Sequence, residues 1–312
     1  GKKFLDKILL KKNNFKKIII FSRDELKQHI LKKRLSSNKN FKKLRFFLGD
    51  IRDKDRLNIA LRDVDIVIHA AALKQVDSAE YNPTEYVKTN VIGSQNIIEC
   101  SIQNDIKKVI ALSTDKASSP INLYGATKLC SDKLFVAANF YSGKNIFSVV
   151  RYGNVFGSRG SVAEVFKNRK NKKVLTVTHK SMTRFNITLS ESIDMVLWCL
   201  KNSYGGEIFV PKIKSYNILD LARAFSNDAT VEFIGVRPGE KISEELISKS
   251  ESRTTIDLGK YYAILPETKN FLKNKYKNKK KVPKNFSYTS DKNSFLTISE
   301  LKNLIKNERF ET

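Results

Sequence analysis

The chain has 312 residues, 41% of them hydrophobic, which suffices for one large core or for a core with a smaller lobe. No apolar run approaches the ~20 residues that span a bilayer, and no charged-then-apolar leader opens the sequence. Three dispersed cysteines, Cys100, Cys130 and Cys199, are typical of a reducing compartment and argue against structural zinc. We therefore expect a cytoplasmic protein that has no membrane partner and binds no metal.

The net charge is +26, from 58 Lys and Arg residues against 32 Asp and Glu residues. The lysines are scattered through every segment, and no basic strand is interleaved with aromatic residues as in an RNA-binding platform. Nucleic-acid binding needs a focused basic patch more than a high total, so we expect no nucleic-acid partner. A positive field would instead attract a substrate that carries a diphosphate.

Strands alternate with helices along the first part of the chain. After an amphipathic helical pattern at residues 4–9, strands are predicted at 17–21, 44–48, 65–69, 109–112 and 147–151, and helices at 53–61, 83–103 and 124–139. This alternation is typical of an α/β fold, a Rossmann-like doubly wound parallel sheet. The pattern loosens later, so we expect an NADP-binding Rossmann domain at 1–153 and a smaller, mixed, mainly substrate-binding lobe at 154–312, with some chain returning to the first domain.

The start of the sequence lacks a feature that this fold requires. A dinucleotide-binding sheet opens with a strand and a glycine-rich turn, which brings a helix N-terminus to the pyrophosphate. Here Gly1 leads directly into the helical pattern. Gly1 is the candidate last glycine of such a turn, and we expect the first strand and most of the glycine loop to be missing from this sequence.

A hydroxyl, a carboxylate, an amine and a phenol are predicted to converge after the strand at 109–112. Thr114 follows that strand, and open α/β sheets bind ligands at the carboxyl ends of their strands. Ten residues later, Tyr124 and Lys128 lie one helical turn apart on the same face. A nearby ammonium would lower the phenol's pKa and let Tyr124 act as a base, while Thr114 shares a proton with a substrate hydroxyl.

Asp115 and Lys116 form a second pair at the same strand end. A charged pair of this kind is most often a solvated surface turn. Beside Tyr124, however, an acid and a base suit removal of a proton next to a carbonyl and expulsion of a neighbouring hydroxyl. We predict both as catalytic residues.

Cofactor and substrate candidates follow the other predicted strands. Arg23 stands where an acidic residue would select NAD, and its guanidinium suits the 2′-phosphate of NADP. The cofactor-binding candidates are Gly1, Ser22, Arg23, Asp50, Ile51, Ala70, Ala71, Ala72, Tyr124, Lys128 and Val155. The substrate-binding candidates are Lys74, Asn154, Arg184, Arg237 and Glu240. Arginines converging from Arg151, Arg184 and Arg237 could clamp a diphosphate.

Taken together, these motifs resemble the extended short-chain dehydrogenase/reductases that act on nucleotide sugars. The resemblance rests on residues 22–26, 69–74, 111–116, 120–124, 151–155, 182–185, 206–211 and 237–241. Within that family, Asp115-Lys116 together with Tyr124 is most similar to the inverting UDP-N-acetylglucosamine 4,6-dehydratases of pseudaminic acid biosynthesis. The chain departs from the pattern at Asn186, where Trp is common, at Gln75, where His is frequent, and at 163–164, near an expected Pro.

The resemblance implies a reaction in which NADP is reduced transiently and regenerated. It implies UDP-N-acetylglucosamine as substrate, a 4-keto-6-deoxy sugar inverted at carbon 5 as product, and a homo-oligomer. A nucleotide-sugar 4-epimerase or a retaining 4,6-dehydratase is an alternative enzyme. A non-catalytic nucleotide-binding protein on the same fold is an alternative of another class.

Overall fold

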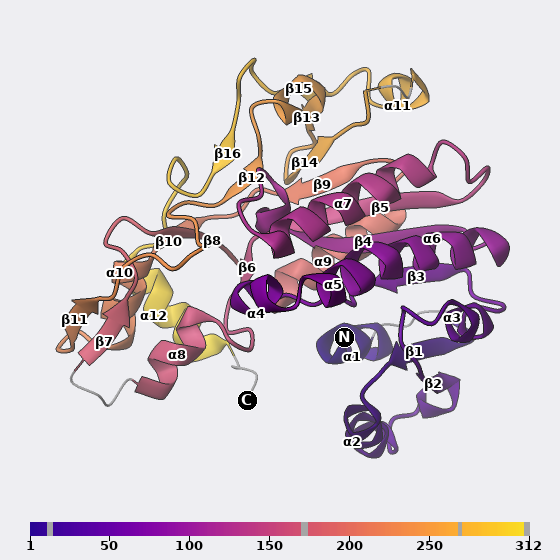
Figure 1. Cartoon of the computed structure of the whole chain (residues 1–312), viewed down its shortest axis with the longest axis horizontal. Coiled ribbons are helices and arrows are strands. Elements are labelled where there is room, and N and C mark those ends of the chain that lie inside the picture. The colour runs from indigo at the N-terminus through magenta and orange to yellow at the C-terminus, as the bar shows by residue number, and fades with distance from the viewer. Residues whose placement is uncertain (11–14, 170–173, 268–269, 309–312) are drawn as a thin grey trace.

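The computed structural model describes residues 1–10, 15–169, 174–267 and 270–308 (Figure 1). Its α-helices are α1 (Lys2–Leu10), α2 (Glu25–Leu35), α3 (Lys54–Ala60), α4 (Val76–Tyr81), α5 (Pro83–Tyr86), α6 (Gly93–Gln103), α7 (Leu123–Ala138), α8 (Val162–Arg169), α9 (Leu189–Asn202), α10 (Ile218–Phe225), α11 (Asn270–Lys275) and α12 (Ile298–Asn307). Short 3₁₀ turns are η1 (Phe41–Lys43), η3 (Asp115–Ala117) and η4 (Glu251–Thr254), and η2 (Val87–Ile92) is a π-helix.

Strands of the described chain form one large sheet and several small ones. They are β1 (Ile18–Ser22), β2 (Leu44–Leu48), β3 (Ile66–His69), β4 (Lys108–Thr114), β5 (Ile146–Tyr152), β6 (Asn154–Val155), β7 (Val174–Val177), β8 (Thr183–Ile187), β9 (Ile208–Pro211), β10 (Ser215–Asn217), β11 (Thr230–Phe233), β12 (Glu245–Ile247), β13 (Thr255–Asp257), β14 (Tyr261–Ile264), β15 (Lys280–Lys281) and β16 (Tyr288–Thr289). The large sheet has the order β15-β13-β14-β9-β5-β4-β3, in which β3, β4, β5 and β9 are parallel.

The centre of the large sheet is buried on both faces, which confirms the predicted doubly wound α/β fold. Along β4, Val109 packs in the same cluster as Phe135 of α7, whereas Ile110 packs in the cluster of Met195 and Cys199 of α9. Figure 1 shows α6 and α7 on one face of this sheet and α9 behind it. Helices on both faces explain why the strand sequence is a continuous apolar run.

The sheet is interrupted beside β3. In the described part of the chain, β1 and β2 form a separate parallel pair, and β3 pairs with β4 alone. In the dinucleotide-binding strand order, the first strand lies between the strands that correspond to β1 and β3. Gly1 precedes α1, whose Leu5 and Leu9 pack in one cluster with Leu31, Leu35 and Leu44.

The predicted helix at 83–103 is not uniform. It comprises α5, the wider π-helix η2 and α6. The side chain of Asn90 in η2 accepts from Leu73 N at 2.9 Å and donates to Leu73 O and Thr127 Oγ1 at 3.0 Å each. The π-turn therefore holds the segment after β3 against α7, and such turns are frequent at functional sites.

The chain after residue 153 divides between the large sheet and a smaller lobe. Strands β9, β13 and β14 join the large sheet. The lobe contains β6-β8-β10, the parallel pair β7-β11, and helices α8, α10 and α12, which share a cluster around Phe166, Leu175 and Leu221. A domain boundary at 153 stays a prediction.

No helix in the described residues combines the length and apolar character that a membrane span needs.

Replacement of Phe135 by Ala tests the core on the α7 face. Phe135 is fully buried, so Phe135→Ala should lower the free energy of unfolding by ~3–5 kcal/mol through lost burial and a cavity. Urea denaturation followed by circular dichroism measures this. The control is Tyr141→Ala, at a side chain 58% exposed, which should cost far less. Equal losses in the two variants would contradict the assigned core.

Candidate active site

The predicted catalytic residues meet where β4 ends and α7 begins. Asn122 caps α7 by accepting from Gly125 N at 2.8 Å, and its amide donates to Gly239 O at 2.8 Å. A Cβ at Gly125 would lie 2.2 Å from Lys116 O, so glycine is needed for this close approach. The first turn of α7 thus rests directly on the backbone of η3, which places Tyr124 beside Asp115 and Lys116.

Tyr124 is buried, and burial raises the pKa of its phenol to about 12. The Lys116 ammonium and the Thr114 hydroxyl oppose that rise. Lys128 was expected to lower this pKa. Instead, its Nζ donates to Leu112 O at 2.8 Å within a fully buried environment. Lys116 is therefore the ammonium that acts on the phenol in this structure.

Asp115 is almost completely buried, with 1% of its side chain exposed, and its Oδ1 accepts from two neighbours. Thr114 Oγ1 donates at 2.9 Å and Lys116 Nζ at 3.0 Å. Its Oδ2 has no hydrogen-bond partner in the structure. Burial raises the pKa of Asp115 and outweighs the opposing effect of Lys116. A buried carboxyl with one free oxygen is suited to hold and deliver a proton.

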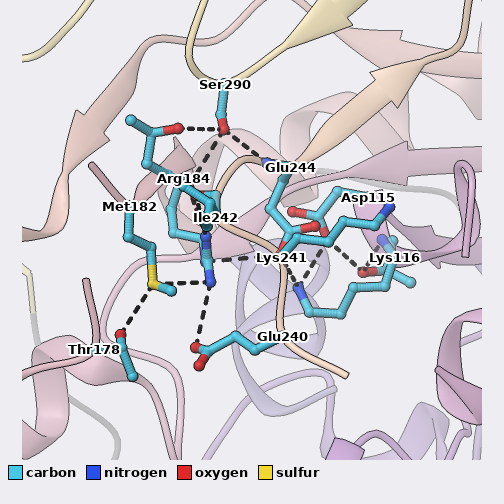
Figure 2. A network of polar contacts seen from close by, with 12 residues as sticks. Asp115, Lys116, Thr178, Met182, Arg184, Glu240, Lys241, Ile242, Glu244 and Ser290 are labelled. Carbon is cyan, nitrogen blue, oxygen red and sulfur yellow. Dashed lines mark hydrogen bonds and ion pairs between the residues drawn. The ribbon is translucent and has the colours of Figure 1, made fainter. Parts of the chain in front are cut away.

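Lys116 contacts a second carboxylate, which the sequence analysis did not identify. Its Nζ lies 3.3 Å from Glu244 Oε1 as well as 3.0 Å from Asp115 Oδ1 (Figure 2). Burial favours the neutral amine, but Asp115 and Glu244 outweigh it and raise the pKa of Lys116 above its ordinary value. Part of the Lys116 side chain is exposed (22%), while its ammonium lies between the two buried carboxylates.

Arg184 on β8 holds the segment that carries Glu244. Its guanidinium donates to the carbonyls of Thr183 and Ile242 at 2.8 and 3.1 Å, and lies 3.3 Å from Glu240 Oε1 and 3.7 Å from Glu244 Oε1. Figure 2 shows Arg184 between Met182, Glu240 and Glu244. Its nitrogens therefore face protein acceptors, and its role in substrate binding stays a prediction.

Arg151 is not part of a diphosphate clamp, contrary to the expectation from sequence. Its side chain is completely buried and lies 3.2 Å from Asp132 Oδ2 and 2.9 Å from Glu251 Oε1. Asp132 follows Lys128 by one turn of α7, and its charge opposes the lowering of the Lys128 pKa by burial. The two carboxylates offset the desolvation cost of burying the Arg151 guanidinium. Removal of one partner would leave a buried charge without an opposite charge.

The ends of β1 and β2 present groups that fit a phosphorylated ribose. Arg23 is half exposed and lies 3.6 Å from Asp50 Oδ2, and Arg52 also pairs with Asp50. Asp24 is engaged as the cap of α2, where it accepts from Lys27 N at 2.8 Å. The acidic neighbour of Arg23 is therefore occupied, and the guanidinium can still meet a phosphate.

The remaining cofactor candidates differ in exposure. Ala70, Ala71 and Ala72 are exposed after β3 and offer a backbone with little side chain, which fits a ligand passing closely. Ile51 is buried, and its Cδ1 would lie 2.6 Å from a Cβ at Gly93, so it packs within the core. Ser22 accepts from Gln28 Nε2 at 2.9 Å. These residues fit a dinucleotide laid along the strand ends, and their roles stay predictions.

The substrate candidates lie around the lobe. Lys74 Nζ donates to Arg159 O at 3.0 Å, and Arg237 is exposed in the turn whose Gly239 meets Asn122. Asn154 and Val155 form β6, and Asn154 is the register partner of Asn186 on β8.

Sequence reasoning missed Glu244, which carries no recognisable local motif. Asn154 was predicted to bind substrate, and Asn186 was noted only as a departure from the family pattern. The carboxamide oxygens of Asn154 and Asn186 and one oxygen of Glu244 are buried without partners. Asn186 and Glu244 belong to segments remote in sequence from 113–128, so neither could be assigned to the site by spacing. Asn154 and Asn186 are register partners on β6 and β8, and buried polar atoms without partners are often found where a ligand or water binds.

Comparisons with known proteins agree with this geometry. The polysaccharide biosynthesis protein family matches residues 1–266. The chain belongs to this family. It is 50% identical over 298 residues to the UDP-N-acetylglucosamine 4,6-dehydratase (inverting) of Campylobacter jejuni, with 92% of this chain and 88% of that protein covered. The resemblance to nucleotide-sugar enzymes is thereby confirmed.

Two further comparisons concern a relative named as an epimerase and a solved structure. The UDP-glucose 4-epimerase of Rickettsia akari is 42% identical over 302 residues, covering 94% of this chain and 87% of that protein. The X-ray structure of Pen from Bacillus thuringiensis superposes with a TM-score of 0.89 at 37% identity, covering 98% and 94%. The family therefore includes relatives named for both epimerisation and dehydration.

Arg151→Met tests the buried ion network beneath the site. Removing the guanidinium leaves Asp132 and Glu251 without their cation, so the variant should lose ~3–5 kcal/mol of unfolding free energy. Urea denaturation measures the loss. Arg253→Met, at a largely exposed pair with Glu267, is the matched control and should change stability little. A variant at Arg151 as stable as the control would contradict the network's role.

Proposed function

We propose that this chain is a 4,6-dehydratase that acts on UDP-N-acetylglucosamine and inverts carbon 5. The observation that carries the proposal is the Asp115–Lys116 pair beside Tyr124, because dehydration needs an acid and a base in addition to the phenol. The 50% identity to relatives of that name supports the same substrate. The proposal includes NADP as cofactor, supported by the half-exposed Arg23 and the engaged Asp24.

Tyr124 would act on the 4-hydroxyl of the sugar. It would take the hydroxyl proton as the phenolate. Burial disfavours that form, whereas the Lys116 ammonium favours it, and the positive charge of a bound nicotinamide would favour it further. A bound nicotinamide dinucleotide would accept the hydride of carbon 4 and later return it to carbon 6. Tyr124 and Lys128, with the strand-end residues 22–23, 50–51 and 70–72, would hold that dinucleotide. The ketone at carbon 4 makes the proton on carbon 5 acidic.

Asp115 and Lys116 would then carry out the elimination with one shared proton. Lys116 passes its proton to Asp115 through the 3.0 Å contact, which leaves a neutral amine and a carboxylic acid. The amine takes the proton of carbon 5, and Asp115 gives its proton to the 6-hydroxyl, which departs as water. The raised pKa of Asp115 favours the acid form that this step requires. Lys116 then returns a proton to carbon 5 on the opposite face.

A 4-epimerase is the second candidate, because relatives of that name are 40–42% identical over nearly the whole chain. Epimerisation inverts carbon 4 and needs no proton transfer at carbons 5 and 6. It would leave Asp115 and Lys116 without a chemical role. A retaining dehydratase would use the same residues and differ in the configuration at carbon 5.

Proton NMR of the purified chain with NADP and UDP-N-acetylglucosamine separates these functions. The proposed enzyme produces a new 6-methyl signal, a 4-keto sugar and an inverted carbon 5. A 4-hydroxyl epimer with no methyl signal would identify an epimerase instead, and a methyl product with unchanged carbon 5 would identify the retaining reaction.

Lys116→Met should abolish formation of the methyl product, because no group remains to take the proton of carbon 5. Transfer of hydride from carbon 4 should still occur, but more slowly, because the Tyr124 phenolate loses the Lys116 ammonium. It is measured as absorbance of the reduced nicotinamide at 340 nm in a single turnover. Lys144→Met, at a lysine beyond α7, is the control and should keep full turnover. Full dehydration by the Lys116 variant would refute its assignment.

Arg23→Ala tests the choice of NADP. A hydrogen bond to a charged group contributes ~1.5–3 kcal/mol, so the variant should bind NADP about tenfold or more weakly. Its affinity for NAD should change little. Isothermal titration with both nucleotides measures the difference, and Arg62→Ala serves as control. Equal loss of the two affinities would argue against a phosphate contact.

A cytoplasmic location and a homo-oligomeric state stay predictions.

A further inference from the structure

Glu244 is a buried carboxylate that joins the acid–base pair to the smaller lobe. With 2% of its side chain exposed, it places Oε1 3.3 Å from Lys116 Nζ and 3.7 Å from Arg184 Nε. Its Oε2 has no hydrogen-bond partner, like Oδ2 of Asp115. Figure 2 shows both carboxylates turned toward the same Lys116 nitrogen.

The backbone around Glu244 is anchored on both sides. Glu244 N donates to Ser290 Oγ at 2.8 Å. Ser290 Oγ lies 2.7 Å from Thr183 Oγ1 and donates to Thr183 O on β8. Ahead of it, Lys241 Nζ donates to Ser118 O at 2.8 Å, next to η3. These contacts hold Glu244 in place, and its 3.3 Å ion pair positions Lys116 relative to β8.

Charged and titratable groups face this carboxylate from every packed element. Asp115 and Lys116 from η3, Arg184 from β8 and Lys241 from its own segment act on Glu244 directly. Tyr124 from α7 and Tyr216 from β10 interact with Lys116, and Glu240 pairs with Arg184. Burial opposes the charge on Glu244, but Lys116, Arg184 and Lys241 outweigh it and keep its pKa below the ordinary value. Glu244 is thus a fixed anion among three cations.

We propose that Glu244 is a positioning residue that holds the Lys116 ammonium in place and retains the proton shared by Asp115 and Lys116. The inference deepens the proposed function and rests on the roles assigned there to Asp115 and Lys116. Asp115 uses Oδ1 for Thr114 and Lys116 and keeps Oδ2 free. Because Glu244 supplies a second contact to the ammonium, Asp115 does not have to turn Oδ2 toward it.

The electrostatic consequence has a definite sign. A fixed anion favours the protonated form of every neighbouring group, so Glu244 raises the pKa of Asp115 and of Lys116. Without it, the pair loses its shared proton at a lower pH. The elimination requires that proton, so the alkaline limb of the pH–rate profile should move downward.

Glu244→Gln keeps the shape of the side chain and removes its charge. The alkaline limb of kcat for formation of the methyl product should move to lower pH by about one unit or more. Glu244→Asp, which keeps the anion, should retain the limb of the unmodified chain even where its rate is lower. Glu99→Gln is the control and should leave profile and rate unchanged, because Glu99 lies on α6 and pairs with Lys54 on α3.

NMR of the chain labelled at lysine ¹³Cε separates failure of this inference from failure of the proposed function. The Lys116 signal is assigned by its loss in Lys116→Met, and its pKa is measured without substrate. A downward shift of at least about one unit in Glu244→Gln supports the inference even if the chain dehydrates no sugar. An unchanged Lys116 pKa, or a slower Gln variant whose pH profile matches the unmodified chain, would overturn it.

Discussion

The contacts of the Lys116 ammonium with two carboxylates organise this molecule. One carboxylate, Asp115, follows the end of β4, and the other, Glu244, precedes β12 and contacts Arg184 on β8 of the smaller lobe. The Lys116 ammonium therefore joins the end of β4 to the segment that follows Lys241, and the Lys241–Ser118 and Asn122–Gly239 hydrogen bonds join the same parts. Each partner would be costly to bury without the other, so the ion pairs couple the geometry of Asp115 and Lys116 to the position of β8.

Different neighbours give two buried carboxyl groups opposite pKa shifts at this site. Asp115 and Glu244 both contact Lys116, yet the pKa of Asp115 is raised while that of Glu244 is lowered. The difference arises because Glu244 also faces Arg184 and Lys241. Two carboxylates whose pKa values are moved apart can serve as proton donor and as fixed anion.

A second group of buried charged residues involves α7, the helix that carries Tyr124. On α7, Tyr124, Lys128 and Asp132 follow one another on the same helical face, and Asp132 pairs with the buried Arg151. Arg151 in turn pairs with Glu251 near β13. The helix that carries the phenol is thus tied both to β5 and to the later chain, which keeps Tyr124 close to Asp115 and Lys116.

The sequence by itself determined the parallel sheet and the residues at its strand ends. Apolar runs such as 109–112 are long enough to show burial on both faces, and the Tyr124–Lys128 spacing shows a shared helical face. These features depend on near neighbours in the chain, so local periodicity reveals them. The π-turn at η2 was not predicted, since Asn90 bonds to Leu73 and Thr127 across the fold.

Only the tertiary structure decided which charges meet. Glu244 lies 128 residues beyond Lys116 in the chain, and no local pattern distinguishes it from the adjacent Glu245. Arg151 was expected to face a diphosphate, but the fold encloses it with Asp132 and Glu251. The partner of a buried charge is set by the packing of distant segments, because desolvation makes each charge depend on whichever opposite charge the fold brings within reach.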